Sequence, residues 1–187
     1  MGAGDLSAAL WQERRQLELL LFRLETQRLH VLAGNLRWLS FTASEVESVL
    51  DRLRFEALAR SVESAAVAAE WGLPAQATLV ELVAGAPPGA WPEVLQDHLD
   101  GLRQLLRQLS DDAQANEDTL RNLNHPVASG ASAGPGGGDV AGAVSQPADA
   151  TGVLDQLTTA GNIERALAVT RRTTQPLLEG YLGGDRD

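Results

Sequence analysis

The chain contains no cysteine and no lysine, few aromatic residues and no long apolar run, and each absence narrows what it can be. Without cysteine there are no disulfides, thiolate metal sites or cysteine nucleophiles. Since only 4% of the 187 residues are aromatic but 44% are apolar, a core must consist mainly of Leu, Val and Ala. There is no apolar run of about 20 residues and no signal-like N-terminus, so we expect a cytoplasmic protein without membrane insertion.

Clustered positive charge is also missing. The basic residues are all Arg, 15 in number against 25 acidic residues, and the formal net charge is −10. Proteins that bind nucleic acid or anionic lipid neutralise phosphates with clustered cations. No such cluster occurs in this sequence, so we expect no nucleic-acid partner.

Motifs for catalysis and for metal or cofactor binding are absent as well. The histidines, His30, His98 and His125, lie far apart, and none has a Glu three residues before it or a second His four residues away. No GxxxxGK[ST] or GxSxG motif occurs, and the glycines at 134–138 lack the flanking strand and helix of a phosphate loop. We therefore expect no enzyme activity, no catalytic residues, no metal and no cofactor.

Leucine at helical spacing dominates what is present. A seven-residue repeat predicts a first helix over about residues 5–33, ending at Gly34: Leu10, Leu17, Leu24 and Val31. A second helix is expected to follow a cap at Asn35 and to stop at Gly72-Leu73-Pro74. Its seam steps by three and four: Leu36, Leu39, Ala43, Val46, Leu50, Leu53, Ala57, Arg60, Ser64, Val67 and Trp71.

A third helix is predicted after a connection over residues 73–91, which itself contains a short helical piece, ATLVELVA. The third helix begins near Pro92 and ends at His125-Pro126. Its seam is the most regular in the chain: Leu95, Leu99, Leu102, Leu106, Leu109, Ala113, Asn116, Leu120 and Leu123. These patterns predict an all-α fold, an elongated antiparallel helical hairpin or three-helix coiled coil. A nearly continuous rod through Gly34, with the third helix folded back on it, remains an alternative.

Two polar residues interrupt the predicted seams. A buried seam Asn commonly sets helix register, and we interpret Asn116 in that way. We expect Arg60 to lie where its seam reaches solvent. The alternative is that this part of the seam is left open for a guest helix.

The last third of the chain has a different character. Residues 126–152 are rich in Gly, Ala, Ser and Pro without apolar periodicity, which predicts a disordered linker between a 1–125 helical bundle and a 153–187 tail. The tail repeats apolar and Thr positions in steps of four and three, as an amphipathic helix does: Ile163, Leu167, Thr170, Thr174, Leu177 and Tyr181. Threonines and Pro176 weaken this helix, so we expect it to be ordered only by docking.

Several stretches resemble a known family in their order and spacing. These are HVLAGNLRWLSFTASEVESVLDRL (30–53), EWGLPAQATLVELV (70–83), WPEVLQDHLDGLRQLLRQLSDDAQANEDTLRN (91–122) and ALAVTRRTTQPLLEGYL (166–182). Together they resemble FlgN-type chaperones of bacterial flagellum assembly, in the form found in high-GC Gram-positive bacteria. The long linker departs from the usual pattern of that family.

The resemblance implies a cytoplasmic type III export chaperone. Such a chaperone binds the helical C-terminal regions of hook-associated proteins 1 and 3, prevents their premature assembly and delivers them to components of the export apparatus. The C-terminal part of the family binds the guest, which implies these partner-binding residues here: Leu120, Leu123, Ile163, Leu167, Thr170, Leu177, Leu178 and Tyr181. The alternative functions are a structural coiled-coil protein that self-associates through Leu99, Leu106 and Leu120, or a helical adaptor.

Overall fold

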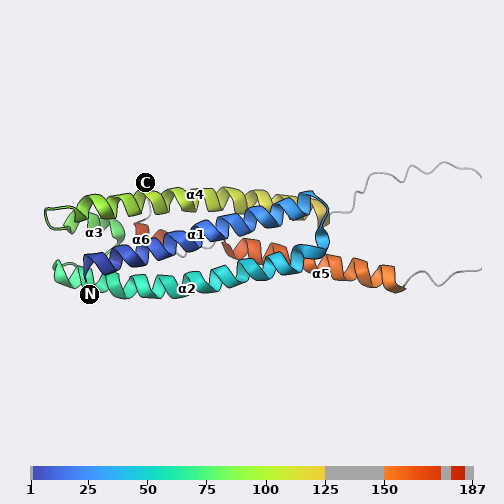
Figure 1. The fold of residues 1–187 in the computed structure, drawn as a ribbon, viewed down its shortest axis with the longest axis horizontal. Helices are drawn as coiled ribbons and strands as arrows, with labels where there is room; N and C mark the ends of the chain where they lie inside the picture. Colours follow the sequence, from blue (N-terminus) through green and yellow to red (C-terminus); the bar gives the residue numbers. More distant parts are fainter. Residues whose placement is uncertain (1, 125–149, 174–177, 184–187) are drawn as a thin grey trace, which may run out of the picture.

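The structure is a computed structural model that describes residues 2–124, 150–173 and 178–183, and all regular elements in these residues are helices (Figure 1). The predicted all-α class is therefore confirmed. Within the same residues, no helix has both the length and the apolar character needed to cross a bilayer. The predicted linker residues 126–149 lie outside the described residues.

The first two helices form an antiparallel hairpin. α1 (Ala3–Leu32) ends in a Schellman motif, in which Gly34 N donates to Val31 O (3.0 Å) and Asn35 N donates to His30 O (2.8 Å). Gly34 has a φ of +71°, a conformation that costs little only without a side chain. The hairpin excludes the continuous rod. Asn35 makes no side-chain cap; a single 3-10 turn, η1 (Leu36–Trp38), leads into α2 (Leu39–Glu70).

A Schellman motif also ends α2. Gly72 (φ +72°) follows the helix, and Leu73 N donates to Ala68 O at 2.7 Å. The predicted short helix is α3 (Leu79–Gly85), which begins with a capping box: Thr78 Oγ1 accepts from Glu81 N, and Thr78 N donates to the Glu81 carboxylate. α4 (Trp91–Asn124) then runs back along the molecule.

α1, α2 and α4 form the predicted elongated three-helix bundle. α1 packs against both other helices along most of its length, and α4 runs parallel to α1 while α2 runs in the opposite direction (Figure 1). The seams point inward as expected, because residues three and four apart share one face of a helix. The buried seam leucines include Leu6, Leu10, Leu17, Leu20 and Leu24 of α1, Leu39, Leu50 and Leu53 of α2, and Leu95, Leu102, Leu109 and Leu120 of α4.

The tail forms two helices and not one. α5 (Ala150–Thr173) packs against α2 and α4 on the side of the bundle away from α1, and α6 (Glu179–Leu182) lies beside α3 (Figure 1). The prediction that residues 150–152 belong to the linker is wrong, since α5 begins at Ala150. The sequence between the two helices contains Pro176, which has no N–H for a helical hydrogen bond.

Candidate helix-binding site

The most distinctive surface is a groove between α2 and α4 that already holds a helix. Ser44 and Glu47 form its α2 edge, Glu117 forms its α4 edge, and Gln27 and Asn116 form its floor. We call this the α2–α4 groove. It exists because α2 and α4 both pack on α1 but are not in close contact with one another along the bundle. α5 fills it, so this half of the molecule has four helices in cross-section.

α5 places one face of its helix into the groove. Buried side chains recur at the i, i+3, i+4, i+7 spacing of an amphipathic helix: Ile163, Ala166, Leu167 and Thr170. The intervening residues Glu164, Arg165 and Ala168 are exposed. A buried Leu or Ile contributes roughly 1.5–3 kcal/mol before the cost of ordering the helix is subtracted. The contacts are therefore those of a helix docked by its apolar face.

A buried polar cluster lies in the floor of the groove, where three helices meet. Asn116 Nδ2 on α4 donates to Gln27 Oε1 on α1 at 2.8 Å. Both side chains are fully buried, as is that of Thr170 on α5. The Thr170 hydroxyl lies 2.8 Å from the carbonyl oxygen of Ala166 and 3.4 Å from Gln27 Oε1. Asn116 thus ties α4 to α1, which fits its predicted role in setting register. Among the described residues, Gln27 Nε2 and Asn116 Oδ1 have no hydrogen-bond partner.

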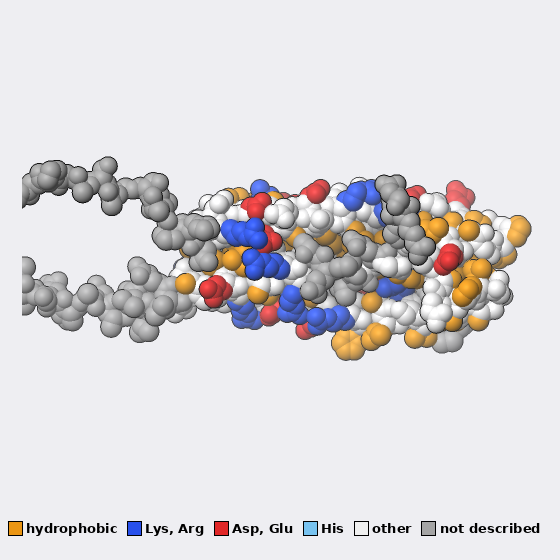
Figure 2. Space-filling model, turned by 180° about the vertical axis from the view of Figure 1, so that it is seen from behind, with side chains coloured by type: hydrophobic (Ala, Val, Ile, Leu, Met, Phe, Trp, Pro, Cys, Tyr) orange, Lys and Arg blue, Asp and Glu red, His pale blue; other side chains and the backbone are white. Residues whose placement is uncertain are grey.

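Arginines of α5 pair with carboxylates on both edges of the groove. Arg165 Nη2 lies 2.6 Å from Glu47 Oε2 and 3.1 Å from Ser44 Oγ on α2, and Arg171 Nε lies 2.8 Å from Glu117 Oε1 on α4. Figure 2, which views the molecule from behind, shows basic and acidic side chains side by side over this half of the bundle. The arginines are roughly half exposed, so each pair contributes at most about 1 kcal/mol. The pairs therefore contribute more to the orientation of α5 in the groove than to its binding energy.

Beyond α5, the α6 segment is attached toward the end of the bundle where α3 lies (Figure 1). Leu178 and Leu182 are buried, and the Tyr181 hydroxyl lies 2.7 Å from Ser64 Oγ on α2. The Tyr181 ring stacks on the Arg60 guanidinium, whose Cζ is 3.9 Å from the ring centroid. Burial raises the pKa of the Tyr181 hydroxyl, while the hydrogen bond with Ser64 opposes that shift. The tail is thus anchored at two places, α5 and α6.

Arg60 does not lie where the seam reaches solvent, so that prediction is wrong. Its side chain is buried, and Nε lies 2.7 Å from Oε2 of Glu13, which is buried as well. Burial raises the pKa of the Glu13 carboxyl, and the charge of Arg60 opposes the rise. An arginine is tolerated on this seam because α1 supplies a carboxylate opposite it and Tyr181 covers it.

The residues predicted to bind a partner are mostly buried within the chain itself. Leu120, Ile163, Leu167, Thr170 and Leu178 are buried, Tyr181 is half-buried, Leu123 is exposed, and Leu177 lies outside the described residues. The structure brings the α5 members together in the α2–α4 groove. The alternative self-association seam is also used internally, since Leu99 and Leu120 are buried and Leu106 is half-buried.

Sequence reasoning missed Glu13 and Gln27, although a signal for both was present. Extending the seam of α1 in steps of four and three from Leu6 gives these buried positions: Leu10, Glu13, Leu17, Leu20, Leu24, Gln27 and Val31. Glu13 and Gln27 of α1 pair with Arg60 and Asn116, which are polar seam residues of α2 and α4. Matching polar seam positions between helices would have identified both pairs. No comparable pattern marks the groove-edge residues, of which Glu47 is half-buried and Glu117 is buried.

No group of three or more His, Asp or Glu side chains suited to a metal ion occurs in the part of the chain that the structure describes. Comparisons with protein-family models, with curated proteins and with solved structures found no match in any of the three.

Proposed function

We propose that the protein is a cytoplasmic, non-enzymatic export chaperone, whose guests are amphipathic helices in the C-terminal regions of hook-associated proteins 1 and 3. It covers these helices, prevents their premature assembly and passes them to the type III export apparatus. The observation that carries the proposal is the α2–α4 groove, because it accommodates the apolar face of a helix from Ile163 to Thr170. In the free chain that helix is α5.

The guest complex forms when the tail leaves the groove. Ile163, Leu167 and Thr170 then become available on the tail, and the floor of the groove becomes available on the bundle. A guest helix that contacts both surfaces replaces the apolar burial lost on opening. The 25 residues between α4 and α5 keep the released tail close to the guest, which favours its return after delivery.

The groove also specifies some chemistry of its occupant. Gln27 Nε2 and Asn116 Oδ1 are buried without a hydrogen-bond partner among the described residues, and each such group costs about 1–3 kcal/mol. A guest helix with an Asn, Gln or Ser at the level of Thr170 satisfies these atoms better than the tail does. The Glu47 and Glu117 edges favour a guest with arginine or lysine beside its apolar face.

A crosslink that holds α5 in the groove tests the proposal directly. The chain has no cysteine, so Ser44→Cys with Arg165→Cys provides two unique thiols on facing edges of α2 and α5. After reaction with a short bismaleimide, we expect the chain to lose binding to the purified C-terminal region of hook-associated protein 1 or 3, measured by isothermal titration calorimetry. The same variant without crosslinker, its thiols capped singly, should bind as the unmodified chain does.

Full guest affinity in the crosslinked chain would show that neither the groove nor the released tail is the site. Absence of any complex between the unmodified chain and both folded hook-associated regions would overturn the proposed guest.

A further inference from the structure

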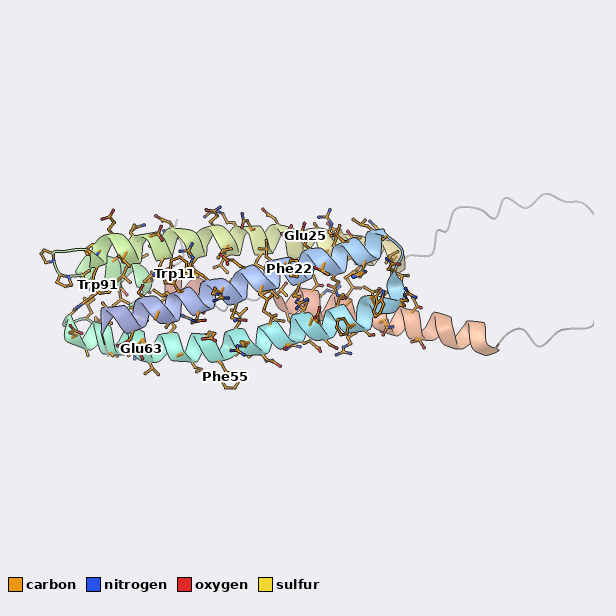
Figure 3. The ribbon with its side chains drawn as sticks, viewed as in Figure 1. Trp11, Phe22, Glu25, Phe55, Glu63 and Trp91 are labelled. Carbon is orange, nitrogen blue, oxygen red and sulfur yellow. The ribbon has the colours of Figure 1, made fainter. Side chains whose placement is uncertain are left out.

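The outer face of α2 carries an exposed apolar stripe that neither the bundle nor the tail uses. Phe55 is 74% exposed, Leu58 66% and Val62 55%, and Figure 3 shows Phe55 projecting away from the bundle. The stripe continues through smaller residues to the end of the helix. We call it the α2 outer face and define it as Phe55, Leu58, Ala59, Val62, Ala66 and Ala69.

Charge is excluded from this face, although 21% of the chain is charged. Fully exposed positions between Phe55 and Ala69 are all uncharged. The charged residues of this stretch turn elsewhere, since Arg60 is buried and Glu56 and Glu63 are half-buried toward the neighbouring helices. A contiguous uncharged stripe with large exposed apolar side chains typically marks an interaction surface.

The distribution of side-chain sizes along the face indicates its occupant. The large residues Phe55 and Leu58 lie in its N-terminal half beside Ala59, whereas its C-terminal half after Val62 contains only alanines. When two such helices pack antiparallel about Val62, position 62 − n of one lies level with position 62 + n of the other. Phe55 then faces Ala69 and Ala66 of the partner subunit, which leave room for its ring.

The charges at the ends of the face match in the same register. Arg52 is exposed, lies beside the face one turn before Phe55, and has its Nε 3.8 Å from Glu56 Oε1 of the same helix. The exposed Glu70 lies beside the face after Ala69. Both residues are on the same edge of the face by helical spacing. In the antiparallel pairing, Arg52 comes within about one turn of Glu70 of the partner subunit, and two-fold symmetry makes this contact twice.

We propose that the α2 outer face is a homodimer interface, in which two copies of this chain pack antiparallel through α2. The face covers 15 residues, about 22 Å of helix. A single helix pair of this length buries less than the roughly 1,200 Å² of a standard stable interface, so the dimer is weak and forms at micromolar or higher concentration. The α2 residues at the edge of the α2–α4 groove, Ser44 and Glu47, lie at least two turns before Phe55 along the helix, so each copy keeps its own guest site.

Sedimentation equilibrium of the full chain from about 1 to 500 µM tests the interface. We expect the average mass to rise from 19.9 kDa toward twice that value. Val62→Arg places two like charges at the two-fold axis and should keep the mass at 19.9 kDa throughout. Phe22→Arg, at an equally exposed apolar position on α1, is the matched control and should dimerise as the unmodified chain does.

A charge-reversal cycle tests the antiparallel register. Arg52→Glu or Glu70→Arg alone should weaken the dimer severalfold, and the two together should restore it. Failure of the double variant to recover would overturn the register. A mass of 19.9 kDa for the unmodified chain over the whole range, or an unchanged dimer in Val62→Arg, would overturn the homodimer and leave the face to a different protein.

Discussion

At the scale of single residues, the core of this bundle is specified by a few buried polar groups within an almost uniform leucine background. Glu13 and Arg60 pair across α1 and α2, and Asn116 and Gln27 pair across α4 and α1. Leucine seams of this kind can slide by one heptad with little loss of apolar contact, whereas a slid register leaves each polar group buried without its partner. The pairs therefore select one register.

The Glu13–Arg60 pair allows a prediction about stability. Arg60→Ala leaves the Glu13 carboxyl buried without a partner and removes the cation under the Tyr181 ring, so we expect a loss of about 3–5 kcal/mol in the free energy of unfolding. Replacing both residues by Leu should recover most of that loss. Urea denaturation at neutral pH measures both changes. Arg54→Ala, which breaks an exposed pair with Asp51, should change the stability by less than about 0.5 kcal/mol.

His98 provides a prediction about pH. Its buried ring lies 2.9 Å (Nε2) from Ser7 Oγ and edge-on to Trp11. Burial lowers the pKa of His98 below its ordinary 6.5, and the Arg14 charge lowers it further, against a weaker opposing effect of Asp97. Below pH 6.5 the unfolded chain therefore binds a proton that the folded chain does not, and the free energy of unfolding falls with decreasing pH until the lowered pKa is reached.

His98→Gln should remove this dependence. We expect its unfolding free energy, relative to the unmodified chain, to rise on going from pH about 7.5 to about 5.5, by at most about 1.4 kcal/mol for each pH unit below the unfolded pKa. Urea titrations at the two pH values give the difference. Ser7→Ala keeps the imidazole and should keep the pH dependence; a dependence that survives in His98→Gln would show that another group titrates.

At the scale of elements, α5 illustrates a helix that tertiary contacts order. Its threonines are poor helix formers. Docking in the α2–α4 groove buries the side chains of Ile163, Ala166 and Leu167. It also pairs Arg165 and Arg171 with carboxylates on α2 and α4. The docked state of α5 therefore depends on a small number of contacts along one face.

Disrupting that face should release α5. Leu167→Asp places a charge at a buried position, and we expect trypsin to cut after Arg165, Arg171 and Arg172 at least about tenfold faster than in the unmodified chain, because cleavage follows the population of the open state. Ala168→Asp adds the same charge at the neighbouring exposed position and should leave the rate unchanged. Mass spectrometry measures the cleavage rates. Equal rates in the two variants would contradict docking through this face.

At the scale of the whole molecule, the tail completes a core that the first three long helices leave open on one side. The same surface has two uses in the proposed cycle, since it stabilises the free protein and receives the guest. An exposed apolar groove would favour aggregation of the free protein, and the docked tail avoids that exposure.

A chain that ends at Gly152 tests this role of the tail. Loss of Ile163, Leu167, Val169 and Leu178 from the core should lower the melting temperature by about 5–15 °C, after the ordering cost of the tail is subtracted. The apolar dye ANS should fluoresce more strongly with the truncated chain than with the full chain. A chain ending at Gly183 should behave like the full chain, and an unchanged melting temperature in the shorter chain would contradict the structural role of α5 and α6.

The sequence by itself determined the three long helices of the bundle and approximately where each ends. Seam spacing, the glycines at positions 34 and 72 and the capping residues of α3 act over a few residues, so they can be read without knowing which elements meet. Of the Asn116–Gln27 pair, only Asn116 was identified from the sequence, as a polar residue on a seam.

Only the tertiary structure decided where the tail lies, that Arg60 is buried, and which apolar residues stay outside. An amphipathic face indicates that something covers it but not what covers it, because the tail's own bundle and a guest helix offer similar apolar burial. The same limit applies to Arg60, whose burial depended on a carboxylate 47 positions earlier in the chain and a tyrosine 121 positions later. Local spacing specifies surfaces, and the competition between distant surfaces selects their partners.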